Sequence, residues 1–239
     1  MLNRVKIRVC YIKETVTMTK ANIIDVDVKR RVQKAVKDGM DLYLTKIKYG
    51  FIEVGLEATF QLQLARIIDD ILQLLTFDIN ERFQIILERN MPILGNKDYV
   101  DIVIKYHNNS VEKLYLIEVK FKKIADAAPD ANTIYSYQDM MNLDAHKNLT
   151  PNVDGCFFIF LTDLQTYKNK PRATGTRAEL PMQDGAIIQS GINYNVTGAS
   201  AIKCMNGYAN GFTFTASHTI EYKEFDINDH LYWFFIEEF

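Results

Sequence analysis

The order of hydrophobic periodicities between residues 55 and 163 constrains the fold of this chain more than any other feature. From Gly55 to Leu75, apolar residues recur at helical spacing along one stripe. Short strand-like runs follow, at 82–90, 99–106 and 113–121, and "HNNS" between the last two predicts a hairpin turn. A second helix is expected from Thr133 to His146, and "GCFFIFLTD" (155–163) is typical of a buried strand. This order predicts an α/β fold in which helices flank a mixed β-sheet.

The regions on either side of this stretch have a different character. Residues 1–50 carry 12 Lys or Arg against 5 Asp or Glu, with a strand expected at "VKIRVCYI" (5–12) and a helix from Val28 to Lys37. Their basic side chains either contact phosphate or form a solvated helix face. Residues 168–217 are rich in Gly, Asn, Thr and Ala, which favours long loops or short irregular strands. We expect one domain over 1–239, made of a basic N-terminal extension (1–50), a core (51–167) and a loop-rich C-terminal part (168–239).

Composition narrows the class of protein. A hydrophobic content of 48% in 239 residues allows a substantial core. Cys10, Cys156 and Cys204 are odd in number and far apart, which argues against a disulfide framework or a zinc knuckle and favours a reducing, cytoplasmic location. No run reaches the length of a membrane span, and the start lacks the apolar stretch of a signal peptide. Scattered histidines and the absence of GxGxxG, Walker A and GxSxG motifs disfavour a histidine metal site, nucleotide binding and serine hydrolysis.

Charged residues interrupt two of the predicted strands. Asp101 stands inside "YVDIVI", and Glu118 and Lys120 stand inside "LYLIEVKF". Residues two apart on a strand share a face, and the hairpin can bring Asp101 close to Glu118. Two desolvated carboxylates repel each other, and a bound divalent cation removes this repulsion. Carboxylate oxygens are ligands that suit magnesium. The alternative is a half-exposed sheet face with a Glu–Lys cross-pair, and a Glu-x-Lys triplet alone is not specific, as "EYK" at 221–223 shows.

A third acid, Glu57, belongs with these residues because of its place on the helix expected from Gly55 to Leu75. Counting about 100° per residue from Leu64 at the centre of the apolar stripe, Glu57 falls roughly 20° from that centre. It is therefore expected to face the sheet. The alternative is a carboxylate placed in the first helical turn by the helix dipole alone.

Together these residues resemble the PD-(D/E)xK nuclease superfamily, with its restriction-endonuclease-like fold. The resemblance covers roughly residues 55–165: a helix with an acid, a strand with Asp ("YVDIVI"), a strand with Glu-x-Lys ("LIEVK"), the helix "YSYQDMMNLD" and the strand "GCFFIFLTD". It implies that Asp101 and Glu118 bind Mg²⁺, that Lys120 assists the attacking water, and that Glu57 completes the acid set. Val100 stands where Pro is usual. Gln138 matches a glutamine of exonuclease-type relatives, but Asn142 replaces the tyrosine that follows it there.

The resemblance implies a magnesium-dependent endodeoxyribonuclease acting on double-stranded DNA, in the manner of a type II restriction endonuclease. The alternatives are a catalytically inactive DNA-binding or interaction protein with the same fold, and a nuclease acting on RNA. A homodimer is compatible with cutting both strands, and the C-terminal "LYWFFIEEF" is either a buried strand or helix or a dimer contact. Candidate DNA contacts lie in "YKNKPRATGTR", an acid-free segment that is otherwise an ordinary exposed loop: Lys168, Lys170, Arg172 and Arg177.

Overall fold

The computed structural model describes residues 20–53, 55–94, 98–109, 111–125, 128–205, 207–227 and 229–239. The strand expected at 5–12 lies outside these residues. The main helices are α1 (Lys20–Lys48), α2 (Glu57–Leu74) and α3 (Pro129–Leu149), with short helices α4 (Gln165–Lys168), α5 (Thr176–Glu179) and α6 (Ala199–Cys204). The main strands are β1 (Glu81–Asn90), β2 (Tyr99–Asn108), β3 (Val111–Lys122), β4 (Val153–Thr162), β9 (Lys223–Ile227) and β10 (His230–Glu238). Two-residue strands occur at β5 (Ile187–Ile188), β6 (Asn193–Tyr194), β7 (Phe212–Thr213) and β8 (His218–Thr219).

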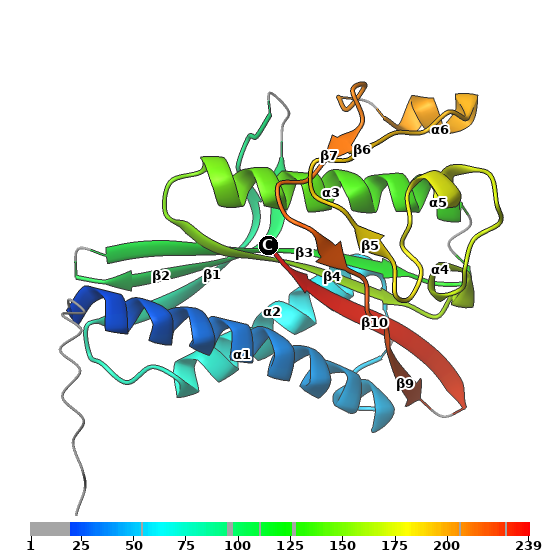
Figure 1. The fold of residues 1–239 in the computed structure, drawn as a ribbon. Helices are drawn as coiled ribbons and strands as arrows, with labels where there is room; N and C mark the ends of the chain where they lie inside the picture. Colours follow the sequence, from blue (N-terminus) through cyan, green and yellow to red (C-terminus); the bar gives the residue numbers. More distant parts are fainter. Residues whose placement is uncertain are drawn as a thin grey trace, which may run out of the picture.

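A six-stranded mixed sheet with the order β1-β2-β3-β4-β10-β9 forms the centre of the molecule (Figure 1). β3 and β4 are parallel, joined by the crossover through α3, and the other neighbours in the sheet are antiparallel. The hairpin between β2 and β3 lies where "HNNS" predicts it. The sheet is therefore mixed and flanked by helices, as the order of periodicities predicts.

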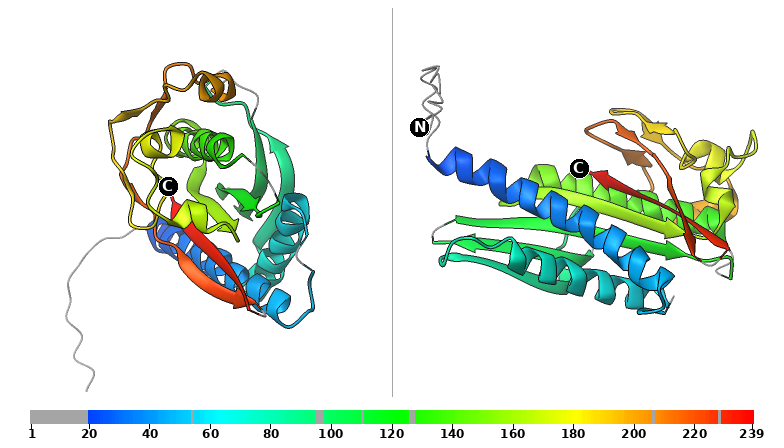
Figure 2. Two further views of the ribbon diagram at one scale, coloured as in Figure 1. Left: turned by 90° about the vertical axis from the view of Figure 1, so that its right-hand side faces the viewer. Right: turned by 90° about the horizontal axis from the view of Figure 1, so that it is seen from below.

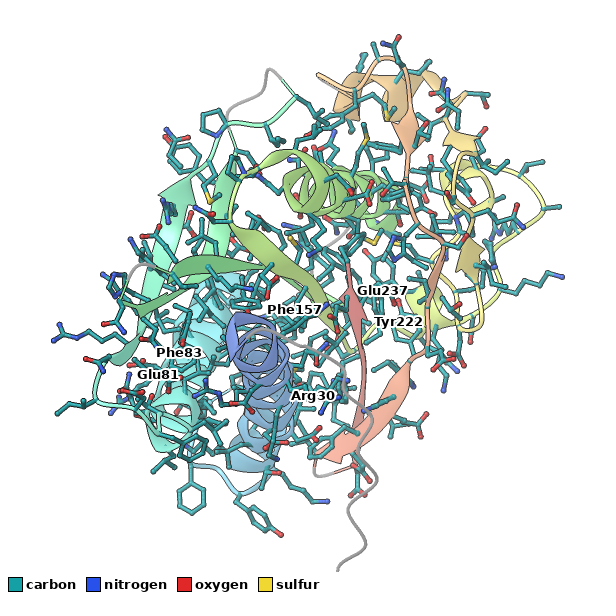
Figure 3. The ribbon with its side chains drawn as sticks, turned by 60° about the vertical axis from the view of Figure 1, so that its left-hand side comes forward. Arg30, Glu81, Phe83, Phe157, Tyr222 and Glu237 are labelled. Atoms are coloured by element: carbon teal, nitrogen blue, oxygen red, sulfur yellow. The ribbon has the colours of Figure 1, made fainter. Side chains whose placement is uncertain are left out.

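Helices cover both faces of this sheet. α1 and α2 pack on one face, and α3 packs on the other (Figures 1 and 2). Phe83 and Phe157 point from β1 and β4 into the core beneath α1 and α2 (Figure 3). Alternate residues such as Phe158 and Phe160 point to the α3 side, so β4 is buried on both faces and its apolar run is continuous.

α1 is longer than the Val28–Lys37 helix predicted from the sequence. The predicted helix ends just before Gly39, a residue type that weakens a helix interior. In the structure a Cβ at Gly39 would lie 2.9 Å from Cγ1 of Ile68 in α2. Glycine is therefore required by the close approach of the two helices, and the apolar stripe of α1 continues beyond it to Ile47.

The structure of the C-terminal region agrees in part with what the sequence predicts. Residues 168–217 form loops with short helices and two-residue strands, which pair as β5 with β8 and β6 with β7, as expected for irregular strands. The final aromatic segment is a strand between β4 and β9, and Trp233, Phe234 and Phe235 are buried within the chain. The alternative in which these aromatics form a dimer contact is therefore wrong, because the chain's own sheet and core cover them. Within the described residues, no helix combines the length and apolar character needed to cross a bilayer.

Candidate functional site

The candidate site lies where β2 and β3 separate. The pairing of these strands ends at Ile102 and Ile117, whereas β3 continues along β4 as far as Lys122. Asp101 and Glu118 occupy the next position on each strand, directly opposite one another by the same register. The two acids that interrupt the apolar runs therefore stand together at this fork between the strands.

Two carboxylates replace the missing strand partner of β3 beyond the fork. The Val119 N–H donates to Oδ2 of Asp101 at 2.8 Å, and the Phe121 N–H donates to Oε2 of Glu57 at 3.0 Å. The same Glu57 oxygen accepts from Nζ of Lys122 at 2.8 Å. Glu57 lies in the first turn of α2 and also faces the sheet, so the position predicted from the apolar stripe is confirmed.

Glu118 and Asp101 form a hydrogen-bonded acid pair. Glu118 is only 4% exposed, and burial, together with the neighbouring Asp101, raises its pKa well above the ordinary value. Burial also raises the pKa of Asp101, although Lys120 and the Val119 N–H oppose that shift. The pKa of Glu118 is therefore raised by both burial and its neighbour, because two adjacent carboxyls that are shielded from water disfavour each other's ionisation.

Lys120 is surrounded by carboxylates. Its Nζ lies 2.6 Å from Oδ2 of Asp139 on α3 and 3.9 Å from Oε1 of Glu57 on α2. Burial alone would lower the pKa of this ammonium, but Asp139, Glu118, Glu57 and Asp101 together raise it. Lys120 is consequently a fixed positive charge at neutral pH, suited to stabilising negative charge rather than to removing a proton.

Sequence reasoning missed Asp139. Its side chain is 20% exposed, and burial raises its pKa to about 6 despite the attraction of Lys120. The one available signal was an acid in the middle of the helix that crosses over the Glu-x-Lys strand. Its neighbour Gln138 does not join the site, since its Nε2 donates to the carbonyl of Cys204 at 2.8 Å.

The donor chemistry of the fork fits Mg²⁺. No cluster of three or more His, Cys, Asp or Glu side chains placed to hold a metal is found within the described part of the chain. Magnesium, however, commonly takes only one or two carboxylates, with water or phosphate filling its other positions. Asp101 and Glu118 supply two such carboxyls, and their mutual repulsion is the conflict that a cation relieves.

The basic loop after β4 carries two side chains that are engaged within the fold and two that are exposed. Lys168 pairs with Glu224 at 3.1 Å and lies over the ring of Trp233, and Arg177 donates to the Thr166 carbonyl. These two residues therefore have structural contacts. Lys170 and Arg172 are exposed. The loop follows the C-terminal end of β4, and since β3 and β4 are parallel, it lies at the end of the sheet where β3 also ends.

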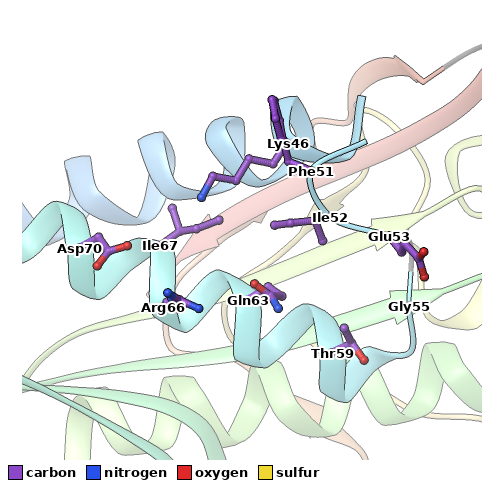
Figure 4. A pocket seen from close by; sticks show the side chains of 10 residues that line it. All are labelled: Lys46, Phe51, Ile52, Glu53, Gly55, Thr59, Gln63, Arg66, Ile67 and Asp70. Carbon is purple, nitrogen blue, oxygen red and sulfur yellow. The ribbon is translucent and has the colours of Figure 1, made fainter. Parts of the chain in front are cut away.

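A large hollow lies elsewhere on the molecule. A groove of about 760 Å³ runs between the end of α1, the following loop and α2, and Lys46, Phe51, Gln63 and Arg66 are among the residues that line it (Figure 4). The acids of the fork do not line this groove.

Comparison of the chain with protein-family models, with curated proteins and with solved structures gives no match. What the site can do is therefore inferred from its chemistry.

Proposed function

We propose that this chain is a magnesium-dependent deoxyribonuclease of the restriction-endonuclease-like class, which hydrolyses phosphodiester bonds of double-stranded DNA. The observation that carries the proposal is the acid pair of Asp101 and Glu118 at the fork, with the Lys120 ammonium on the same strand. An acid pair and a cation that are largely withdrawn from water are costly to fold and have a clear use in phosphoryl chemistry.

Each side chain has a role in such a reaction. Asp101 and Glu118 would hold Mg²⁺, which when bound activates water and neutralises charge on the scissile phosphate. Lys120 would orient the attacking water and stabilise the charge that develops on the phosphate in the transition state. Glu57 accepts hydrogen bonds from the Phe121 N–H and from the Lys122 ammonium. It would thereby hold the end of β3 in position beyond the point where β3 stops pairing with β2.

The basic side chains of the loop after β4 support double-stranded DNA as the substrate. Lys170 and Arg172 are exposed at the end of the sheet where β3 and β4 finish. Positive side chains in such a place suit contacts to the phosphate backbone of a duplex whose scissile bond lies at the fork.

Cleavage of plasmid DNA in the presence of Mg²⁺ tests the proposal. Asp101→Ala, Glu118→Ala and Lys120→Ala should each abolish cleavage while circular dichroism shows an intact fold. The matched controls are Glu221→Ala and Lys223→Ala, because they alter an exposed Glu-x-Lys triplet of the same spacing elsewhere in the chain. The controls should keep full activity. Full activity in any of the three fork variants ends the proposal.

A second function is favoured by a specific observation. Asp101 and Glu57 both accept backbone N–H groups of β3, and Lys120 is paired with Asp139, so the charged residues also hold the fork together. A DNA-binding or interaction protein without catalysis would keep them for that reason. Titration calorimetry with Mg²⁺ and Mn²⁺ separates the two functions: DNA binding without cation binding supports the inactive protein. Hydrolysis of matched DNA and RNA duplexes decides the substrate.

A further inference from the structure

The closest partner of Lys120 comes from outside the strands that carry the nuclease pattern. Oδ2 of Asp139 lies 2.6 Å from Nζ of Lys120, against 3.9 Å for the nearest oxygen of Glu57. Both side chains are mostly buried, at 15% exposure for Lys120 and 20% for Asp139. Lys120 is therefore held mainly from the α3 side of the sheet.

α3 is a rigid support for this contact. Ile134, Tyr137, Met140 and Leu143 are fully buried against the sheet and the C-terminal loops. Asp139 stands between Tyr137 and Met140 in this packed stretch, so its carboxylate has a fixed place relative to β3. A fixed partner restricts the lysine to one position. A lysine side chain has a flexible four-carbon stem and would otherwise retain many rotamers.

The alternative partner of Lys120 is the acid pair itself. Glu118 lies two residues away on the same face of β3, and its carboxyl interacts electrostatically with both Lys120 and Asp139. An ammonium paired directly with Glu118 would compete for the oxygens that the proposed function assigns to a cation. A carboxylate on α3 that attracts the ammonium leaves those oxygens available.

We propose that Asp139 is a positioning residue for Lys120, which holds the ammonium in a direct ion pair and so keeps it from pairing with the oxygens of Asp101 and Glu118. This role rests on the proposed nuclease function. Asp139 acts through Lys120 and does not itself contact the reacting phosphate. It is the fourth acid of the site and the only one that comes from the helix between β3 and β4 within the described residues.

Amine-reactive labelling read by mass spectrometry tests the contact without any measurement of activity. In Asp139→Asn, Lys120 should be modified several-fold faster than in the wild type. Lys122 is an internal control, because it pairs with Glu57 and its labelling should not change. Asp144→Asn is the matched control variant, since Asp144 is a buried acid of the same helix that binds Thr215 instead. Unchanged labelling of Lys120 in Asp139→Asn overturns the proposal.

Single-turnover cleavage tests the consequence. Asp139→Asn should lower the cleavage rate by about 10- to 100-fold, the range usual for residues that orient a catalytic group. DNA affinity should stay the same, and Asp139→Glu should restore part of the rate. A normal rate in Asp139→Asn, or an equal loss in DNA affinity, overturns the positioning role. If circular dichroism shows that the Asn variant does not fold, Asp139→Ser replaces it in both experiments.

The two assays separate failure of this inference from failure of the proposed function. A wild-type chain that binds DNA but does not cleave it refutes the nuclease, and labelling then still decides whether Asp139 holds Lys120. A wild-type chain that cleaves, with Lys120 labelled equally in both forms, keeps the nuclease and refutes the positioning role.

Discussion

Glu118 has the least favourable environment of any charged side chain at the fork. It is 4% exposed, hydrogen-bonded to a second acid and close to Asp139. Buried carboxyls in contact with each other cost folding free energy, because each disfavours ionisation of the other. Proteins retain such residues at functional sites, where stability is lower than the fold allows.

Replacement of Glu118 by Gln should therefore stabilise the protein when divalent cations are absent. The amide can still donate to Asp101 but carries no charge, so the free energy of unfolding should rise by about 1 kcal/mol. Added Mg²⁺ should stabilise the wild type and leave the variant unchanged, because binding to the folded state alone raises stability. Urea unfolding with EDTA and with Mg²⁺ measures both effects. A variant less stable than the wild type in EDTA would mean that Glu118 is a structural residue.

At the level of elements, one buried ion pair joins α1 to the edge of the sheet. Arg31 donates from both terminal nitrogens to Glu81 of β1, at 2.8 and 2.7 Å, and also to the Leu75 carbonyl at the end of α2. The Tyr106 hydroxyl donates to the same carboxylate. Arg31 thus ties together the first helix, the second helix and the first strand.

Glu81→Gln should cost about 3 kcal/mol of stability at neutral pH, because it leaves the Arg31 charge buried without its partner. The hydrogen bonds from Arg31 lower the pKa of Glu81 to about 2 from its ordinary 4.5. A lowered folded-state pKa stabilises the protein above pH 4.5, and this contribution disappears as the pH falls from 4.5 to about 2. The variant should lose less stability than the wild type over that window.

Urea unfolding of both proteins between pH 7 and pH 2 measures this effect. Glu112→Gln is the control, because Glu112 also pairs with a basic side chain, Lys105, but in a pair of which about a third of each side chain is exposed to solvent. Its substitution should change stability little at any pH. Equal acid sensitivity in Glu81→Gln and the wild type would mean that the buried pair does not set the acid response.

The elements between 57 and 162 were predictable because their hydrophobic patterns are local. The helical stripe of α2 and the apolar run of β4 each lie within about twenty consecutive residues. The place of β10 between β4 and β9 was not predictable, since it depends on pairing between distant segments. The fork has the same origin: β3 continues along β4 after β2 has ended its pairing, and no local pattern sets that point.

The candidate site was predictable to the extent that its residues belong to the strand pattern. Asp101, Glu118 and Lys120 interrupt apolar runs, and Glu57 lies on the apolar stripe of α2, so each is visible in the sequence. Asp139 lies on a helix whose polar and apolar residues alternate less regularly, and its partner is 19 positions earlier. Only the packing of α3 over β3 brings them together.

For the molecule as a whole, the proposed function raises the question of which surface would contact a DNA duplex. The net charge is −2, so attraction to a duplex must come from local groups of basic residues. One group is the loop with Lys170 and Arg172, at the end of the sheet where β3 and β4 finish. Another is the exposed side of α1, which includes Lys34 and Lys37. Only the first lies beyond the strand that carries Glu118 and Lys120.

The salt dependence of DNA affinity distinguishes these surfaces. Each lysine or arginine that contacts a phosphate of B-DNA contributes about −0.9 to the slope of log affinity against log salt. Lys170→Ala with Arg172→Ala should therefore reduce the steepness of that slope by about 2 and weaken binding similarly for all sequences. Lys34→Ala with Lys37→Ala removes the same charge from α1 and should leave the slope unchanged. Fluorescence anisotropy over a salt series measures both. The opposite result would place the duplex on α1, on the far side of the sheet from the α3 layer, and a scissile phosphate bound there would not reach Lys120.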